Sequence, residues 1–305
     1  MNKDTAKINS EQVRKALLRS GYLLEARLKT IIRKTSYCVE TNISYPDPST
    51  QKSRELDLFA YHAYSIGGNT DGTLVAKLLI ECVNNPQPLA FIMKQPLGGP
   101  PYEDLYVKRA GLPMSTEVDN NESLPEFLRM FDYHHYFTGN VASQYCSFAK
   151  KKGTDPEWMA FHEESHFESF RKLSDAIEYF ICKYYEQWVS SPDQRVDIRL
   201  YYPILVVQGD LLEVLPSKRS LRVKKVRSVR YRRSAILNGK ETYYQIDVVT
   251  EKFLPELLQI INKELLETAN RIRTNHDAIM KAIEMKLQRL RERGTLDLIR
   301  QVLES

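Results

Sequence analysis

The chain has 305 residues, of which 42% are hydrophobic and 27% are charged, and it carries a net charge of +5. This length allows one large domain or two modest ones with a sizeable core. The mild positive charge permits a polyanionic partner without requiring one. No run of about 18 apolar residues occurs, which argues against a membrane span, and the first residues lack the apolar core of a secretory signal.

Four widely spaced cysteines occur, at Cys38, Cys82, Cys146 and Cys182. None of them forms a CxxC pair, which argues against thiolate zinc sites and dithiol redox motifs. We therefore expect four reduced cysteines in a cytoplasmic protein.

Helical spacing of apolar residues predicts a first helix over residues 11–34, with Ser10 as its N-cap. Three strands are expected next, at Tyr37–Tyr45, Leu56–Ile66 and Leu74–Val83. The third is nearly continuously apolar, as in a central strand covered on both faces. A fourth, shorter strand is expected at Leu89–Met93.

The second half of the chain contains further helices and strands. We expect a long helix at Phe161–Val189, a buried strand at Leu200–Val207, a hairpin through Gly209-Asp210 into LLEVL, a hairpin of Val229–Leu237 and Thr242–Val249 around Asn238-Gly239, and a helical remainder. This order predicts an α/β fold with a mixed sheet. We expect one domain at residues 1–250 with a loop-rich insertion at about 95–160, and a helical extension at 251–305 that packs on it or projects from it.

Three acids stand out against these elements. Glu25 lies in the first helix, Asp57 in the strand sequence RELDLFA, and Glu81 at the end of the apolar sequence LLIEC. If the second and third strands pair as a hairpin, Asp57 and Glu81 converge, and two buried carboxylates repel one another. A divalent cation resolves this repulsion, and hard oxygen ligands favour Mg²⁺ or Mn²⁺.

These residues resemble the motif of the PD-(D/E)XK, or restriction-endonuclease-like, nuclease superfamily. The motif resemblance covers residues 11–95, and the order of elements extends it to 161–210. The resemblance implies an αβββαβ core and DNA cleavage by metal-activated water. It also implies metal binding by Asp57, Glu81 and the backbone carbonyl of Cys82, with Glu25 holding a water at the metal.

Val83 occupies the position at which the family has a lysine. Loss of such a group typically costs on the order of 10²–10⁴ in rate. Lys94 would approach Glu81 if residues 89–94 formed a tight hairpin with its strand. Lys77 shares the face of Glu81, but about 13 Å away by strand rise. The substitution is compatible with natural loss of activity, with a lysine supplied from elsewhere, and with a change introduced to inactivate the enzyme.

A basic run at residues 218–233 suits contacts with the phosphates of DNA. The alternative is a solvated hairpin edge, where lysines prevent edge pairing. We expect the nucleic-acid contacts to come from Arg222, Lys224, Lys225, Arg227, Arg230, Arg232 and Arg233.

Two other functions fit parts of the sequence. The same fold could serve as a non-catalytic module that binds nucleic acid, or that binds a partner protein or a second copy through the C-terminal helix. His162 and His166 formally fit HExxH, the zinc-peptidase motif, if they lie one turn apart on a helix. His134 and His135 are expected to serve packing or to lie on the surface, and Arg54 is an alternative partner for Asp57. A role in defence against foreign DNA rests on family analogy alone.

Overall fold

The computed structural model describes most of the chain. The described residues are 7–19, 22–47, 50–67, 72–85, 87–94, 107–111, 127–151, 157–162, 164–190, 196–216, 220–237 and 240–293.

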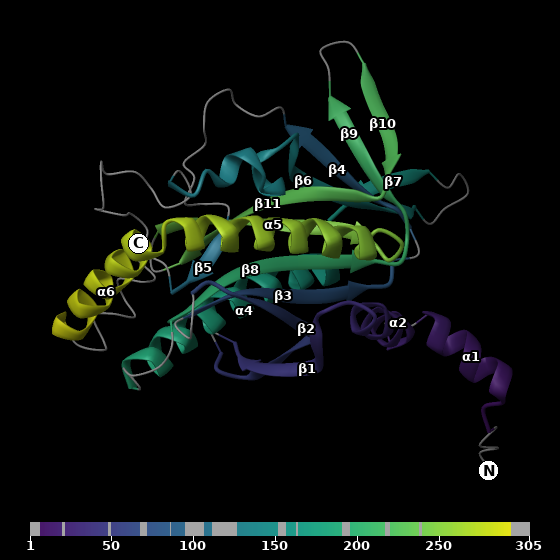
Figure 1. Cartoon of the computed structure of the whole chain (residues 1–305). Helices are drawn as coiled ribbons and strands as arrows, with labels where there is room; N and C mark the ends of the chain where they lie inside the picture. The colour runs from purple at the N-terminus through teal and green to yellow at the C-terminus, as the bar shows by residue number, and fades with distance from the viewer. Residues whose placement is uncertain are drawn as a thin grey trace.

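The described helices lie at both ends of the chain and in its middle (Figure 1). They are α1 Ser10–Arg19, α2 Tyr22–Arg33, α4 Glu164–Ser190, α5 Leu254–Thr274 and α6 His276–Arg293, with two 3-10 turns, η2 Met130–Asp132 and η3 His135–Phe137. The described strands are β1 Cys38–Pro46, β2 Ser53–Ser65, β3 Gly72–Val83, β4 Leu89–Lys94, β5 Lys108–Ala110, β6 Val141–Lys150, β7 Trp158–Phe161, β8 Val196–Val207, β9 Leu211–Pro216, β10 Leu221–Val226, β11 Ser228–Leu237 and β12 Lys240–Thr250.

These strands form one large mixed sheet in the order β1-β2-β3-β8-β12-β11-β6-β4-β9-β10. β1, β2 and β3 pair antiparallel, β8 lies parallel to β3, and β12 lies parallel to β8. β5 pairs with β8, and β7 pairs with β6. The mixed α/β class expected from the sequence is therefore confirmed.

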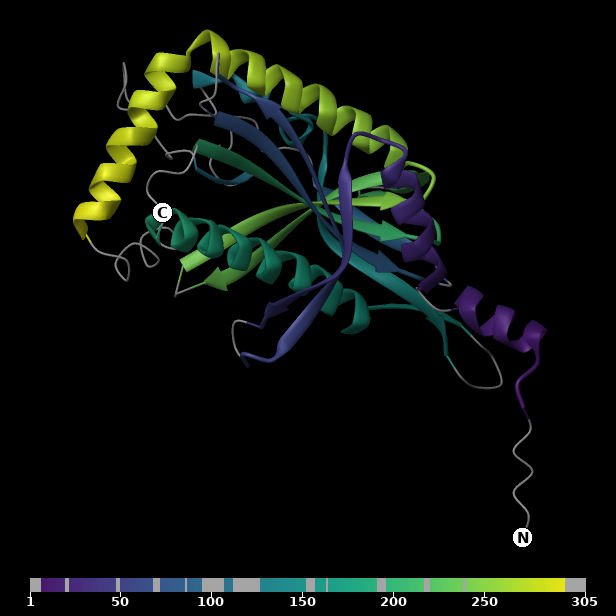
Figure 2. The ribbon, with the colours of Figure 1, turned by 60° about the horizontal axis from the view of Figure 1, so that its bottom comes forward.

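Two long helices cover opposite faces of the sheet (Figure 2). α5 packs on one face of β2 and β3, while α4 packs on the other face of β2, β3 and β8. Coverage on both sides explains why β3 is almost continuously apolar, with Leu78, Leu79 and Ile80 fully buried. The expected central strand is thus confirmed.

Several pairings differ from the sequence expectation. The single helix expected at 11–34 is two helices, α1 and α2, and Ser20 and Gly21 lie outside the described residues. The hairpin expected through Gly209-Asp210 is wrong, because β9 pairs with β4 and β10 rather than with β8. The segment expected to be loop-rich contains strands β5 to β7 in its described part.

The hairpin expected around Asn238-Gly239 is confirmed in its strands, because β11 and β12 pair antiparallel from Ser228–Val249 to Leu237–Lys240. The two turn residues themselves lie outside the described part of the chain. Within that described part, no helix combines the length and the apolar character needed to span a bilayer.

Candidate functional site

Asp57 and Glu81 lie side by side at one end of the β2–β3 pair. The antiparallel register pairs Phe59 with Leu79 and Leu58 with Ile80, so Asp57 and Glu81 follow as the next neighbours across the strands. The backbone N–H of Cys82 donates a hydrogen bond of 2.7 Å to Asp57 Oδ2. The hairpin expected to bring the two acids together is therefore confirmed.

Glu81 is buried, with only 2% of its surface exposed. Its Oε2 accepts a hydrogen bond of 3.0 Å from Lys172 Nζ. Its Oε1 is buried and has no hydrogen-bond partner among the described residues. Burial and the neighbouring Asp57 together raise the pKa of Glu81 to about 8, against the opposing effect of the Lys172 ammonium. This carboxylate therefore has one oxygen with unmet bonding capacity.

Glu25 belongs to the same electrostatic group, although it comes from α2. Burial and then the charge of Asp57 raise the pKa of the Glu25 carboxyl. Burial also raises the pKa of Asp57, and the Cys82 N–H and Lys172 only partly offset this increase. Asp57 thus raises the pKa of both Glu25 and Glu81, as expected for carboxyls grouped in a partly dry environment. Hard oxygen donors of this kind fit a divalent cation, which would relieve the repulsion.

Lys172 supplies the positive charge of the site, and it comes from α4. Burial lowers the pKa of its ammonium, but Glu81 and Asp57 together outweigh burial and raise the pKa above its usual value. The Tyr45 hydroxyl donates to the Lys172 backbone carbonyl at 2.9 Å, which ties this turn of α4 to β1. Val83 meanwhile packs in the core, with 8% of its surface exposed.

Lys94 does not lie beside the β2–β3 pair that carries the two acids. β4 does not pair with β3, because β8, β12, β11 and β6 lie between them in the sheet. Lys94 is exposed at the end of β4, paired with Val141 of β6. The expectation of a β3–β4 hairpin, and with it the role suggested for Lys94, is wrong.

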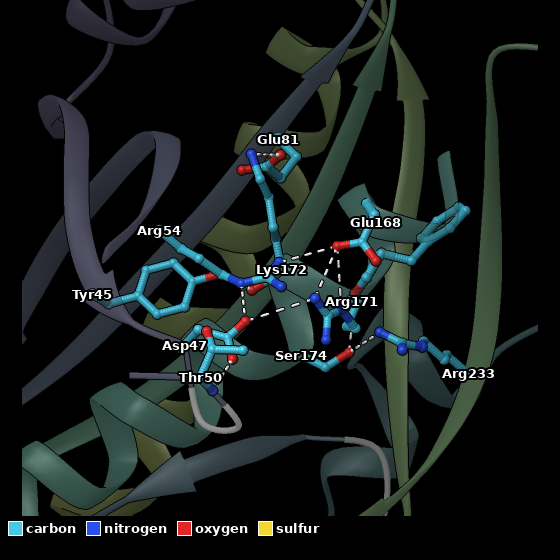
Figure 3. A network of polar contacts seen from close by, with 11 residues as sticks. Tyr45, Asp47, Thr50, Arg54, Glu81, Glu168, Arg171, Lys172, Ser174 and Arg233 are labelled. Atoms are coloured by element: carbon cyan, nitrogen blue, oxygen red, sulfur yellow. Dashed lines mark hydrogen bonds and ion pairs between the residues drawn. The ribbon is translucent and has the colours of Figure 1, made fainter. Parts of the chain in front are cut away.

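A network of alternating charges surrounds the first turns of α4 (Figure 3). Arg54 Nη1 donates to Glu168 at 3.1 Å, and Arg54 Nε donates to Asp47. Arg171 bonds the same Glu168 at 3.1 Å. Arg54 is therefore paired with Asp47 and Glu168 rather than with Asp57, which leaves Asp57 available to the acid group.

The residues of the basic run fall into different environments. Arg222, Lys224 and Lys225 are exposed on β10, and Lys225 pairs with Asp210 at 2.7 Å. Arg227 is exposed and pairs with Glu256 at 3.0 Å.

The β11 members of the run point to opposite sides of the sheet. Arg230 donates to the backbone carbonyls of His135 and Asn140, and Arg232 lies over the Tyr243 ring. Arg233 Nη1 donates to Ser174 of α4 at 2.8 Å, which places Arg233 on the side of the acid group (Figure 3).

His162 and His166 do not form the motif of a zinc peptidase. α4 begins at Glu164, and His162 lies before it as an exposed residue whose ring contacts Tyr145 edge-on at 5.3 Å. His166 is buried within the helix. The expectation that the two histidines lie one turn apart on one helix is therefore wrong.

A second cluster of possible ligands lies under α5. Among the described residues, His134, His135 and Glu264 bring three ligand atoms within 4.8 Å of one another. Their atoms already have protein partners: His135 Nδ1 lies 2.8 Å from Glu264, His135 Nε2 lies 3.1 Å from Asp247, and His134 Nδ1 accepts from the Tyr136 N–H.

The histidine rings also stack, with centroids 5.1 Å apart and planes inclined by 11°. Because the lone pair of a ring nitrogen lies in the plane of its ring, stacked rings do not aim at one ion. Burial would lower the pKa of His135, but Asp247 and Glu264 raise it to about 10. The two carboxylates therefore favour the protonated form of His135, and both histidines lie packed beneath α5.

Comparison of the chain with protein-family models, with curated proteins and with solved structures gave no match.

Proposed function

We propose that the protein hydrolyses phosphodiester bonds of DNA with the help of Mg²⁺ or Mn²⁺. The observation that carries this proposal is the contact of Lys172 with Glu81, beside Asp57. It supplies a lysine at the acid pair although Val83 stands at the family's lysine position. Of the three explanations for Val83, a lysine from elsewhere in the chain is the one that this contact favours.

The order of elements supports the same proposal. α2, the antiparallel β1–β2–β3, α4 and β8 follow one another in the αβββαβ order implied by the resemblance. The strands β4 to β7 are inserted between β3 and α4. The acids lie where the resemblance requires them, on the first helix of this core and on its second and third strands.

The cation would be held by Asp57, Glu81 and the carbonyl of Cys82. When bound, it would polarise a phosphate and lower the pKa of a bound water. The unpartnered Oε1 of Glu81 supports this assignment, since it is an oxygen donor with no other described partner.

The remaining roles belong to side chains already in place. Lys172 stabilises negative charge that develops on the phosphate, which Val83 cannot do because it has neither charge nor hydrogen-bond donor. Glu25 accepts a hydrogen bond from the attacking water. Arg233, on the same face of the sheet as the acid group, would bind a neighbouring phosphate of the same strand, and the exposed Arg222 and Lys224 of β10 would add further phosphate contacts.

The experiment that tests this proposal is nicking of supercoiled plasmid with Mg²⁺ or Mn²⁺. Lys172→Met should lower the rate by about 10²–10⁴, and Asp57→Ala should abolish it. The matched control is Lys263→Met, which removes an exposed lysine from α5 on the opposite face.

A double variant tests whether the position from which the lysine comes matters. In the Lys172→Met background, Val83→Lys should restore part of the lost rate, because it returns an ammonium to the same acid pair. If the wild-type chain binds DNA but cuts it with neither metal, the protein is a non-catalytic binding module and the proposal fails. Cleavage that survives Lys172→Met unchanged would remove Lys172 from the mechanism.

A further inference from the structure

A pocket of about 160 Å³ lies between α4 and the sheet, apart from the acid group. β2, β3, β8 and α4 all contribute residues to its lining. Lys77 is four residues before Glu81 on β3, so the pocket lies about 13 Å along the strand from the candidate metal site. It opens on the same face of the sheet.

Three cations line this pocket, one from each of three elements. Lys77 comes from β3, Arg199 from β8 and Lys183 from α4. The parallel register pairs Lys77 with Tyr201 and Val75 with Arg199, so Lys77 and Arg199 project from neighbouring strands.

Carboxylates compensate these cations only in part. Arg199 Nη2 lies 3.8 Å from Asp197, while its Nε is buried without a hydrogen-bond partner in the described part of the chain. The Nζ atom of Lys77 lies over two rings, 5.2 Å from the centroid of Phe59 and 4.5 Å from that of Tyr61. None of the described carboxylates forms an ion pair with Lys77.

Bringing these charges together costs free energy. Burial, and then the charge of Arg199, lower the pKa of Lys77 to about 8, against weaker opposing effects of Asp197 and Glu40. Like charges held in a partly dry pocket are stabilised by a bound anion, just as the acid pair is stabilised by a cation.

The pocket's size and apolar floor restrict the ligand. Its volume is far larger than one water requires and smaller than a typical site for a drug-sized ligand. Phe59 and Phe180 stack on each other, with centroids 4.9 Å apart, and Tyr201 is held by a bond to the Phe180 carbonyl. The rings therefore form a fixed floor, and the cations provide the specific contacts.

We propose that this pocket binds a phosphate group carried by a nucleotide. Lys77, Arg199 and Lys183 line it from three elements, and several cationic donors around one pocket match the several acceptor oxygens of a phosphate. The ring floor accommodates the attached sugar. This binding requires neither a divalent cation nor the acid group, so it holds independently of the proposed nuclease activity.

Calorimetric titration in EDTA tests the proposal, with thymidine 5′-monophosphate and thymidine as probes. We expect the monophosphate to bind and thymidine to bind at least tenfold more weakly. Lys77→Met should weaken monophosphate binding at least tenfold. Because Lys183 is exposed, Lys183→Met should weaken binding without disturbing the fold, and it keeps the test valid if Lys77→Met is unstable.

The controls separate this site from other basic surfaces. The Lys263→Met variant should bind the monophosphate as tightly as the wild type does. The Asp57→Ala variant should retain monophosphate binding while losing any nicking activity. If the monophosphate fails to bind the wild type, or binds wild type and Lys77→Met equally, the proposal is overturned.

The source of the phosphate is decided by a third probe. A 5′-phosphorylated oligonucleotide that depends on Lys77 while its 5′-hydroxyl counterpart does not would identify a strand end. Lys77-dependent binding of the monophosphate alone would identify a free nucleotide. Either result supports the pocket as a phosphate site.

Discussion

Glu81 places a carboxylate in a strand whose neighbours Leu79 and Ile80 are fully buried. Its pKa of about 8 lies above the ordinary value of 4.5, chiefly because of burial and then because of Asp57. Between these two values the folded chain keeps a proton that the unfolded chain releases. Stability therefore falls as the pH rises through this window, by at most about 1.4 kcal/mol per pH unit.

Glu81→Gln removes this dependence. In EDTA, we expect the variant to melt at a higher temperature than the wild type, with an advantage that grows from pH 5 to pH 8. Thermal unfolding followed by circular dichroism at each pH measures the two melting temperatures and the difference between them. Glu11→Gln, an exposed change on α1, should follow the wild-type curve. A Glu81→Gln advantage that does not change with pH would show that the carboxyl titrates normally.

At the scale of single residues, the sequence was informative where a side chain contradicts its surroundings. Glu81 could be identified because acids are rarely buried in so apolar a strand, and Asp57 because pairing of the two strands brings it to Glu81. Lys172 could not be identified from the sequence, because a lysine beside the apolar stripe of a long helix is ordinary. Its contact with Glu81 joins residues 91 positions apart, and only the packing of α4 on β3 creates it.

At the scale of elements, β10 and β11 divide the predicted DNA contacts into two kinds. Arg222 and Lys224 are exposed on β10, whereas Arg230 is bonded to backbone carbonyls inside the fold. We expect the double variant Arg222→Gln, Lys224→Gln to lower the salt slope of DNA binding by about 2 with an unchanged melting temperature. Fluorescence anisotropy across a salt series measures the slope.

Arg230→Gln should give the reverse result in the same assays. Its loss removes bonds to His135 and Asn140, so the melting temperature should fall while the salt slope stays near that of the wild type. If the β10 double variant leaves the slope unchanged, DNA does not contact that strand.

The turn η3 is held between β12 and α5 by His135, which lies between Asp247 and Glu264. The pKa of His135 is about 10, above the ordinary value of 6.5. His135 therefore stabilises the folded state fully below pH 6.5, and this stabilisation is lost as the pH rises through 10. His135→Gln leaves two buried carboxylates without their cation and should cost about 3–5 kcal/mol at pH 7. Urea unfolding should show a smaller cost at pH 10.

The pH dependence of stability that comes from His134 is opposite to that from His135, because burial lowers the pKa of His134 to about 4. His134 therefore stabilises the folded state fully above pH 6.5, and this stabilisation is lost as the pH falls through 4. Together, His134 and His135 favour the folded state most near pH 6.5. His162→Gln, at an exposed histidine, is the control and should not change stability at either pH. Equal costs of His135→Gln at pH 7 and pH 10 would contradict a charged imidazole.

Elements with strong local patterns were predictable. The β11–β12 hairpin follows from Asn238-Gly239 between two apolar runs, and β3 follows from its length and apolar content. The pairing of β9 with β4 was not predictable, because it joins segments that are separated in the chain by β5 to β8 and by the long α4. Local turn residues at Gly209-Asp210 suggested a hairpin that this long-range pairing replaces.

For the whole molecule, a bound cation should stabilise the folded state, since the unfolded chain has no assembled acid group. Saturating Mn²⁺ should raise the melting temperature, with a gain of about 2.7 kcal/mol at 100 times the dissociation constant. Differential scanning calorimetry measures the shift. Asp57→Ala should abolish it, whereas His162→Gln should not. A shift that persists in Asp57→Ala would place the ion elsewhere in the chain.

α4 carries Lys172 at the acid pair and Lys183, three turns later, at the phosphate pocket. Asp57 and Glu81 come instead from the paired strands β2 and β3. The proposed affinity for a cation and the proposed capacity to cut therefore depend on different elements of the chain. A displacement of this one helix would uncouple them, leaving a metal-binding protein that is inert towards DNA, and the same displacement would open the neighbouring pocket.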